Sequence, residues 1–310
     1  MLSSDNLRAL LGRIEAGPIT RFAPAPTGHL HLGHLVNAIF VWGIARARGG
    51  RIVLRIEDHD RSRCRPEYEA ALLEDLEWLG LEPDIGAVHE FRSGQLRYRQ
   101  SDNGAAYQSA LETLRRQGLI YACDCSRKDL AAIGGDPLNL ETRYAGRCRS
   151  RELEERPGLG LRVRIDPGIE SFDDLLLGPQ EQEPDRQCGD LLLRDRLGNW
   201  TYQFAVVVDD LGQGISLIVR GEDLLDSTGR QLRLRRLLGG AAAPALLHHP
   251  LIRRPDGAKL SKGNRDTSIR ELRAAGAKPA ELLGRAAALA GLTNSTAPIT
   301  AAELPRLFGY

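Results

Sequence analysis

The chain has 310 residues, of which 42% are hydrophobic, and its 42 basic and 41 acidic residues leave a net charge of +1. This length allows one large domain or a few smaller ones, and the balanced charge excludes a globally basic nucleic-acid-binding protein, so any polyanion site is local. No stretch has the length of a membrane span and the N-terminus has no signal-peptide core, so we expect a cytoplasmic monomer without membrane contact.

The first 118 residues carry the pattern of a strand–helix–strand unit. After an amphipathic N-terminal helix, a short strand precedes an apolar series with three-to-four spacing that ends at Gly49 and Gly50, and a second strand follows directly. This order implies a parallel sheet with a right-handed crossover. We therefore predict an α/β fold with a Rossmann-type parallel-sheet core, with strands at 18–24 and 51–58 and helices at 32–48, 66–80 and 103–118.

The rest of the chain divides into three segments. Residues 119–188 are rich in turns around short strands and are predicted to form an insertion. Alternating strand and helix patterns return in 189–265, and residues 266–310 are alanine-rich and helical. We therefore expect the two halves of the core at 1–118 and 189–265, with the insertion between them and a short helical segment after them.

The stretch from Arg21 to Leu35 combines prolines, glycines and histidines at the predicted start of a helix. His31 and His34 share a helical face there, and Gly33 leaves no side chain over that face. The N–H groups at a helix N-terminus bind anions, and imidazoles add donors for phosphate oxygens. Taken alone, two histidines at this spacing are more typical of a helix cap or of zinc ligands.

A lysine pair, Lys259 and Lys262, lies in the sequence KLSKG. Such a pair is commonly just part of a solvated loop. Combined with the histidines that follow the first strand, however, it describes a nucleotide clamp. In this clamp the helix N-terminus holds one side of a triphosphate and the lysines close on the other side.

The insertion contains three of the five cysteines within 26 residues: Cys123, Cys125 and Cys148. An odd number of cysteines with this clustering fits a reducing compartment and a metal site better than a disulfide framework. Three thiols suit zinc, which prefers tetrahedral sulfur coordination and needs a fourth ligand. Cys188 and water are two candidates for that ligand, and Cys64 is interpreted as structural.

The motifs HLGH and KLSKG resemble the two signatures of the class I aminoacyl-tRNA synthetases. Over about residues 19–265 the chain is more specifically similar to the glutamyl-tRNA synthetase group, through RFAPAPTGHLHLGHL, LRIEDHDRSR, VVVDDLGQGISLIVRGEDLLDSTGRQ and HHPLIRRPDGAKLSK. Two positions depart from the usual pattern: Leu260 replaces methionine and Gly263 replaces a common serine. The first change conserves side-chain volume, and the second removes a hydroxyl.

The resemblance implies that a glutamate carboxylate attacks the α-phosphorus of ATP and releases pyrophosphate. In this reaction His31, His34 and Lys262 would stabilise the developing charge together with Mg²⁺ on the phosphates. Gly33, Lys259 and Lys262 would bind ATP. The residues implied to bind L-glutamate are Arg21 and Arg220 (carboxylates), Glu57 (ammonium), Tyr202 (hydrogen-bond partner) and the lining residues Phe22, Ala23, Pro24 and Ala25.

The cysteine pattern and the C-terminal segment narrow this resemblance to short relatives, the glutamyl-Q tRNA(Asp) synthetases. Only 47 residues follow Gly263, which is too few for a separate anticodon-reading domain of typical size. The resemblance implies transfer of glutamate to queuosine in the anticodon of tRNA(Asp), so the expected partners are ATP, L-glutamate and this tRNA. It also implies one structural Zn²⁺ held by Cys123, Cys125, Tyr144 and Cys148.

Two other functions are compatible with these motifs. One is a minimal glutamyl-tRNA synthetase that charges a terminal ribose, and the other is a degenerate core that binds tRNA as a regulator. The length argues against the first, and the intact signatures argue against the second. The expected RNA contacts are arginines of the insertion, which are otherwise a solvated surface: Arg143, Arg147, Arg149 and Arg151.

Overall fold

The computed structural model describes residues 4–126, 128–129, 143–252 and 267–309. Within these ranges, no helix has the length and apolar character needed to cross a membrane. The elements up to the insertion are α1 (Ser4–Gly12), β1 (Ile19–Phe22), α2 (Leu32–Ala47), β2 (Arg51–Leu54), α3 (Pro66–Leu79), α4 (Val88–Arg92), η1 (Gln100–Asp102) and α5 (Gly104–Arg116). The strands and helices predicted in this half are all present.

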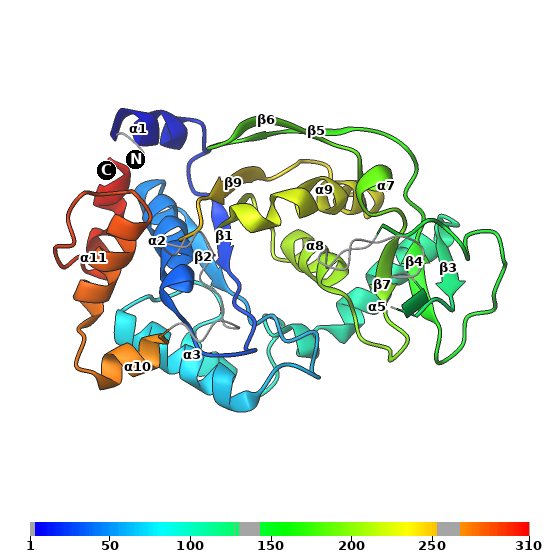
Figure 1. Cartoon of the computed structure of the whole chain (residues 1–310), viewed down its shortest axis with the longest axis horizontal. Helices are drawn as coiled ribbons and strands as arrows, with labels where there is room; N and C mark the ends of the chain where they lie inside the picture. Colours follow the sequence, from blue (N-terminus) through cyan, green and yellow to red (C-terminus); the bar gives the residue numbers. More distant parts are fainter. Residues whose placement is uncertain (1–3, 127, 130–142, 253–266, 310) are drawn as a thin grey trace.

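The following elements build the insertion and the second half of the core (Figure 1). They are β3 (Ile120–Cys123), β4 (Gly160–Val163), β5 (Glu170–Asp174), β6 (Gly178–Gln182), α7 (Pro184–Gln187), β7 (Leu191–Arg194), α8 (Tyr202–Gly212), β8 (Leu217–Gly221), η2 (Glu222–Ser227), α9 (Thr228–Leu237) and β9 (Ala245–His249). The C-terminal elements are α10 (Ile269–Ala274), α11 (Pro279–Leu289) and η4 (Ala301–Phe308).

Parallel strands form the centre of the molecule. β1 pairs with β2, and β8 pairs with β9, which in turn pairs with β5; all three pairs are parallel. β1 lies beside β8, because the Ser216 N–H donates to the Ile19 carbonyl at 2.9 Å. The carboxyl ends of β1, β2 and β8 therefore lie close together, which is where open α/β sheets bind ligands.

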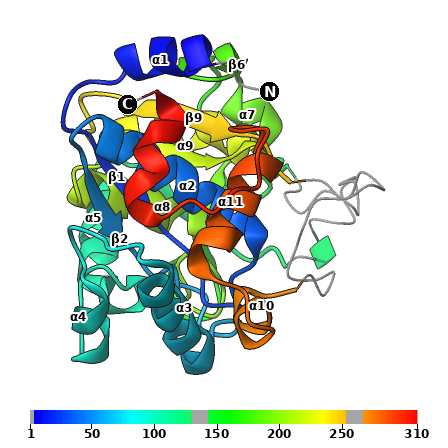
Figure 2. The same ribbon diagram turned by 90° about the vertical axis from the view of Figure 1, so that its left-hand side faces the viewer.

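Helix α2 packs against this sheet and is itself covered by the C-terminal elements. It contacts β1, β2 and β8, while α11 and η4 lie against it (Figure 2). A Cβ at Gly43 would come within 2.2 Å of the Phe308 ring, so glycine at this position lets η4 approach the helix closely. Residues 267–309 thus complete the hydrophobic core around α2.

A separate antiparallel sheet of β3, β4 and β7 lies at the opposite end of the molecule from α11 (Figure 1). This sheet takes in residues on both sides of the predicted boundary at Cys188, because β7 follows that boundary and pairs with β4. β5 and β6, which fall inside the predicted 119–188 segment, pair instead with the core sheet. Short strands of this kind do not carry their pairing partners in their sequence.

Candidate active site

The loop between β1 and α2 places the two histidines at the helix N-terminus, as predicted. His31 is the N-cap residue: the Gly33 N–H donates to its Nδ1 at 3.1 Å, and its own N–H donates to His34 Nδ1 at 3.1 Å. Because both Nδ1 atoms accept hydrogen bonds, each neutral ring carries its proton on Nε2 as a donor. The capping role and the predicted phosphate-binding role are therefore compatible.

Gly33 is held close to these rings. A Cβ at this position would lie 2.9 Å from His31 Cε1, so any larger residue would displace the imidazole. The two imidazole centroids are 4.0 Å apart. The other half of the predicted clamp, Lys259 and Lys262, lies outside the described residues.

Two of the predicted glutamate-binding residues, Arg21 and Glu57, meet through one buried network of ion pairs. Arg21 of β1 donates to Asp210 at 3.1 Å. Arg55, which is completely buried, donates to Asp210 at 2.7 Å and to Glu57 at 3.1 Å. Burial opposes both charges, but the three carboxylates Asp210, Glu57 and Asp209 raise the pKa of Arg55, and the two arginines lower the pKa of Asp210.

Arg220 is the buried cation that this network leaves without a counter-ion. Its guanidinium donates to three neutral acceptors, His248 Nε2 at 3.0 Å, Gln231 Oε1 at 2.6 Å and Thr228 Oγ1 at 2.8 Å. Among the described residues no carboxylate forms an ion pair with it, and burial lowers its pKa. An anionic ligand at this position would supply the missing charge.

Tyr202 links these groups at the N-terminus of α8. Burial and the nearby Glu57 raise the pKa of its phenol, and Arg220 and Arg21 act on it in the opposite direction. The phenol therefore stays a neutral hydrogen-bonding group between the predicted carboxylate and ammonium positions. The backbone of Phe22 to Ala25 forms the adjoining wall, since the Glu57 N–H donates to the Pro24 carbonyl at 3.1 Å.

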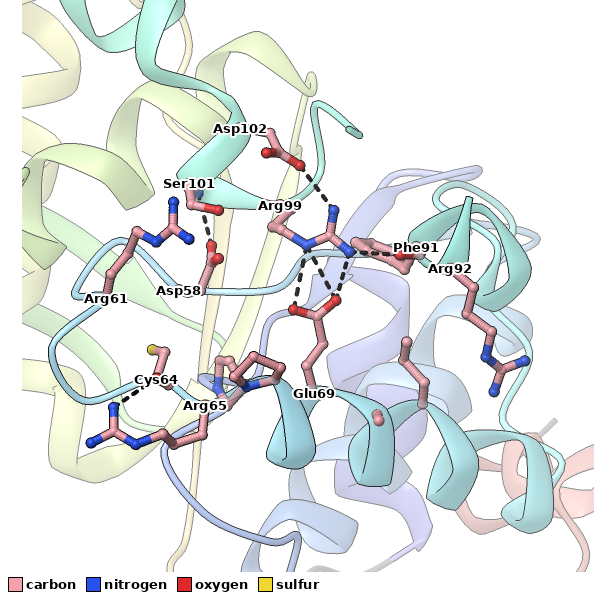
Figure 3. A pocket seen from close by; sticks show the side chains of 14 residues that line it. Asp58, Arg61, Cys64, Arg65, Glu69, Phe91, Arg92, Arg99, Ser101 and Asp102 are labelled. Atoms are coloured by element: carbon pink, nitrogen blue, oxygen red, sulfur yellow. Dashed lines mark hydrogen bonds and ion pairs between the residues drawn. The ribbon is translucent and has the colours of Figure 1, made fainter. Parts of the chain in front are cut away.

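Two cavities adjoin the loop that carries Glu57. The first, of about 570 Å³, lies between α3, α4 and η1 (Figure 3). Arg99 crosses it to bind Glu69 at 2.6 Å and Asp102 at 2.9 Å, and Asp58 accepts the Ser101 N–H at 2.8 Å. These bonds fix the loop after Glu57 to η1. Cys64 borders the cavity and donates to the Glu57 carbonyl at 3.9 Å, in keeping with a structural role.

The second cavity, of about 520 Å³, extends from Tyr202, one of the predicted glutamate-binding residues, to the insertion. Tyr202 and His59 lie on its core side, and Cys123, Cys125 and Arg162 lie on its insertion side. Trp200 and Leu192 add apolar surface.

The three predicted cysteine ligands lie together beside this cavity. The sulfur atoms of Cys123, Cys125 and Cys148 are all within 4.8 Å of one another and all three residues are buried. The Cys125 and Cys148 sulfurs are 3.6 Å apart, close to the edge of about 3.8 Å that a tetrahedron with 2.3 Å zinc–sulfur bonds requires. The donor set and its spacing therefore fit a zinc ion.

The fourth-ligand candidates separate in space. The Tyr144 hydroxyl lies 3.5 Å from Cys123 Sγ and accepts the Cys148 N–H at 2.8 Å. Cys188 instead packs in the neighbouring apolar core, and its thiol donates to the Pro184 carbonyl at 3.0 Å. The geometry therefore favours Tyr144 over Cys188, and Arg162 stacks 3.7 Å from the Tyr144 ring centroid, where it favours negative charge.

Three of the predicted RNA-contacting arginines are engaged within the insertion. Arg149 pairs with Asp190 at 3.1 Å, Arg151 pairs with Asp124 at 2.8 Å, and Arg143 donates to the Asp185 carbonyl at 3.1 Å. Arg143 and Arg151 are exposed and Arg149 is half-buried, so RNA contact stays a prediction for them. The fourth residue, Arg147, is exposed.

Residues central to the site were not recognised in the sequence. Arg55, Asp209 and Asp210 form the buried network, and His248 orients Arg220 while its Nδ1 lies 2.7 Å from Asp174. The available signal was the run VVVDD, since two adjacent aspartates after three valines on one helix cannot both face solvent if the helix is buried.

Comparison with known proteins shows which family the chain resembles. Residues 19–305 match the family model described as tRNA synthetases class I (E and Q), catalytic domain. The chain is 41% identical to a glutamyl-Q tRNA(Asp) synthetase of Nitratidesulfovibrio vulgaris over 90% of this chain and 88% of the relative. It is 40% identical to one of Symbiobacterium thermophilum, over 93% of this chain and 91% of that protein.

A solved structure shares the same fold. It is a glutamate tRNA ligase from Elizabethkingia meningosepticum in complex with its amino acid, with a TM-score of 0.75 and 26% identity. The match covers 94% of this chain but 65% of the ligase, so this chain spans slightly less than two thirds of that protein.

Proposed function

This chain belongs to the glutamyl-Q tRNA(Asp) synthetases, within the class I glutamyl- and glutaminyl-tRNA synthetase family, and on that premise we propose how its residues act. It is a ligase whose catalytic domain activates glutamate. We propose that the activated glutamate passes from glutamyl-adenylate to queuosine in the anticodon of tRNA(Asp). The acceptor would reach the adenylate through the cavity that joins Tyr202 to the insertion.

The observation that carries the proposal is the buried cation Arg220 beside Arg21, Glu57 and Tyr202. A dicarboxylic amino acid supplies one carboxylate to Arg220, a second group to the Arg21 side and an ammonium to Glu57. A monocarboxylic amino acid, whose side chain carries no negative charge, would leave a buried charge unpaired, which is the basis of strong discrimination. We assign selection of L-glutamate to this set.

Activation itself is mainly a matter of alignment and charge. The glutamate α-carboxylate attacks the α-phosphorus, and pyrophosphate leaves. The α2 N-terminus with the Nε2–H donors of His31 and His34 would hold the phosphates, and Mg²⁺ bound with ATP would neutralise part of their charge. Lys259 and Lys262 would close on the other side, with Lys262 acting on the reacting phosphates.

ATP–pyrophosphate exchange tests this assignment. Wild-type protein should exchange with glutamate, whereas Lys262→Ala should keep glutamate binding and lose exchange by about 2 to 4 kcal/mol of transition-state stabilisation. Binding is measured by calorimetry on the same preparations. Full exchange activity in Lys262→Ala would show that Lys262 has no role in glutamate activation.

The acceptor is tested separately with labelled glutamate, ATP and tRNA(Asp) with or without queuosine. Label that depends on queuosine supports the proposal, and label without it indicates charging of a terminal ribose. An absence of both exchange and transfer would indicate a tRNA-binding regulator.

We also propose one structural Zn²⁺ at Cys123, Cys125, Cys148 and Tyr144, where the ion would fix the insertion at the cavity wall.

A further inference from the structure

The second cavity contains an imidazole to which the reaction described above gives no role. His59 lies on the loop that carries Glu57, is half-buried, and borders the cavity together with Tyr202. Its ring centroid is 6.1 Å from that of Tyr202. It is thus placed between the glutamate pocket and the space through which an acceptor hydroxyl would arrive.

A buried hydrogen-bond chain determines which nitrogen of His59 carries the proton. Gln100 Nε2 donates to Asp209 Oδ2 at 2.8 Å, so the other end of this amide, Oε1, faces His59 and accepts. Oε1 lies 2.6 Å from His59 Nδ1, which therefore carries the proton. Asp209 is held as an acceptor by two further donors, Asn103 at 2.6 Å and Tyr107 at 2.9 Å.

This chain leaves Nε2 of the neutral ring with a free electron pair. No other described residue forms a hydrogen bond with the ring. The chain just before His59 is also held in place, because Asp58 accepts the Ser101 N–H at 2.8 Å and the Gln100 N–H donates to the Ile56 carbonyl at 3.0 Å. A basic nitrogen is thus held in one tautomer at the edge of the cavity.

We propose, on the basis of the function proposed above, that His59 is the general base of the transfer step. The acceptor hydroxyl oxygen forms a bond with the glutamyl carbonyl carbon while its proton moves to His59 Nε2. The bond between that carbon and the phosphate oxygen breaks, and AMP leaves with the electron pair. The imidazolium then returns its proton to solvent. His59 has no part in the earlier attack on ATP.

The substitution His59→Asn tests this role with little disturbance. The asparagine amide places an N–H close to the position of Nδ1, so it preserves the bond to Gln100 and removes only the base. Single-turnover transfer from preformed glutamyl-adenylate should slow by about 10² to 10⁴-fold, while ATP–pyrophosphate exchange should change much less. Transfer at the wild-type rate in His59→Asn overturns the proposal and assigns the base to the adenylate phosphate.

Chemical rescue separates a base from a structural residue. His59→Ala opens space for a free imidazole, which should restore part of the transfer rate in His59→Ala and none in His59→Asn. An absence of rescue in His59→Ala counts against proton transfer at this position. If the wild type transfers glutamate to no RNA, the proposed function fails; if wild type and His59→Asn transfer equally, only the role of His59 fails.

Discussion

The proposed glutamate pocket, formed by Arg21, Glu57, Tyr202 and Arg220 with Arg55 and Asp210, and the cysteine cluster bury ionisable groups in opposite ways. In the pocket, Arg55 and Arg21 are neutralised by Asp210 and Glu57, and among the described residues there Arg220 alone is left for the charge of a ligand. In the cluster, burial raises the pKa of Cys125 to about 12. The Arg55 network is therefore preorganised by the chain alone, whereas Cys125 is expected to ionise only when a cation binds.

The cluster also contains a mixed case. Burial opposes ionisation of Cys123, but the contacts with Tyr144 and Arg162 outweigh it and lower the pKa of this thiol. The Arg162 Nε donates to Cys123 Sγ at 3.3 Å. One thiolate is thus favoured in advance and can provide the first bond to an incoming metal ion.

The largest expected effect is loss of the metal from the cluster. Cys148→Ser should reduce bound zinc from about one ion per chain to nearly none, because a hydroxyl is a poor ligand for zinc beside two thiols. Cys188→Ser is the matched control, since its thiol lies outside the cluster. Metal analysis of the purified proteins measures this, and equal zinc in both variants would mean that the cluster is not the metal site.

The second expected effect is a loss of stability when Arg55, the central cation of the pocket, is replaced. Arg55→Met leaves Asp210 and Glu57 without their shared partner and should lower the free energy of unfolding by about 3 to 5 kcal/mol. Arg92→Met provides the contrast, because its pair with Glu77 is about half exposed and is expected to contribute at most about 1 kcal/mol. Urea unfolding of both variants measures the difference. Similar losses would show that the buried network adds no special stability.

These contrasts also show what the sequence could predict. The residues on the glutamate side, Arg21, Glu57, Tyr202 and Arg220, were recognised through motifs, because each lies in a short stretch with a characteristic pattern. Arg55 lies two positions before Glu57 in the same stretch, yet its role depends on Asp210, 155 positions away. Contacts at such separation follow from the tertiary packing of distant segments, which local patterns do not encode.

The fold shows the same difference between local patterns, which the sequence reveals, and long-range pairing, which it does not. The strand–helix–strand unit was predictable because β1, α2 and β2 are consecutive and strongly patterned. The pairing of β5 with β9 was not, since the two strands are separated by about 70 residues and meet at a single position, Asp174 opposite Leu246. For the metal site, the spacing of the cysteines predicted three ligands. The argument against Cys188 as the fourth ligand came only from the structure, where Cys188 packs in the apolar core.

The third expected effect concerns a buried group that is kept neutral instead of being paired. Burial lowers the pKa of His249 to about 4, and its ring stacks on Phe40 at 5.0 Å. Because the folded state disfavours the proton, the unfolded state binds more protons between pH 6.5 and 4, and stability is lost as the pH falls. We expect about 2 kcal/mol less stability at pH 5 than at pH 7.5 from this residue.

The control for this pH dependence is His249→Gln. Its amide can accept the hydrogen bond that Asn37 Nδ2 offers at 3.1 Å, and it does not titrate. Urea unfolding between pH 5 and 7.5 should therefore show a smaller slope for the variant. If the pH dependence of the unfolding free energy were unchanged in the variant, another group would cause the loss of stability in acid. His248 is one such group, because burial also lowers its pKa.

The smallest expected effect concerns the fourth ligand of the cluster. Burial and the side-chain hydrogen bonds with the Cys148 and Cys123 thiols raise the pKa of Tyr144, so the phenol is neutral until a cation binds. A bound zinc ion with Arg162 over the ring favours the phenolate, which makes Tyr144 a ligand of modest strength. Tyr144→Phe should therefore keep one zinc ion per chain, since three thiols remain, but weaken its affinity about tenfold, or about 1.4 kcal/mol.

Competition with a chromophoric chelator measures this affinity, and the result distinguishes two structural roles. The Tyr144 hydroxyl also accepts the Cys148 N–H at 2.8 Å, so its removal leaves a buried donor unpaired. If Tyr144 serves only that N–H, Tyr144→Phe should lower stability equally with and without zinc and leave the zinc affinity unchanged. A loss that appears only in the metal-bound protein requires the oxygen to contact the ion, because the Cys148 N–H is unpaired in both states.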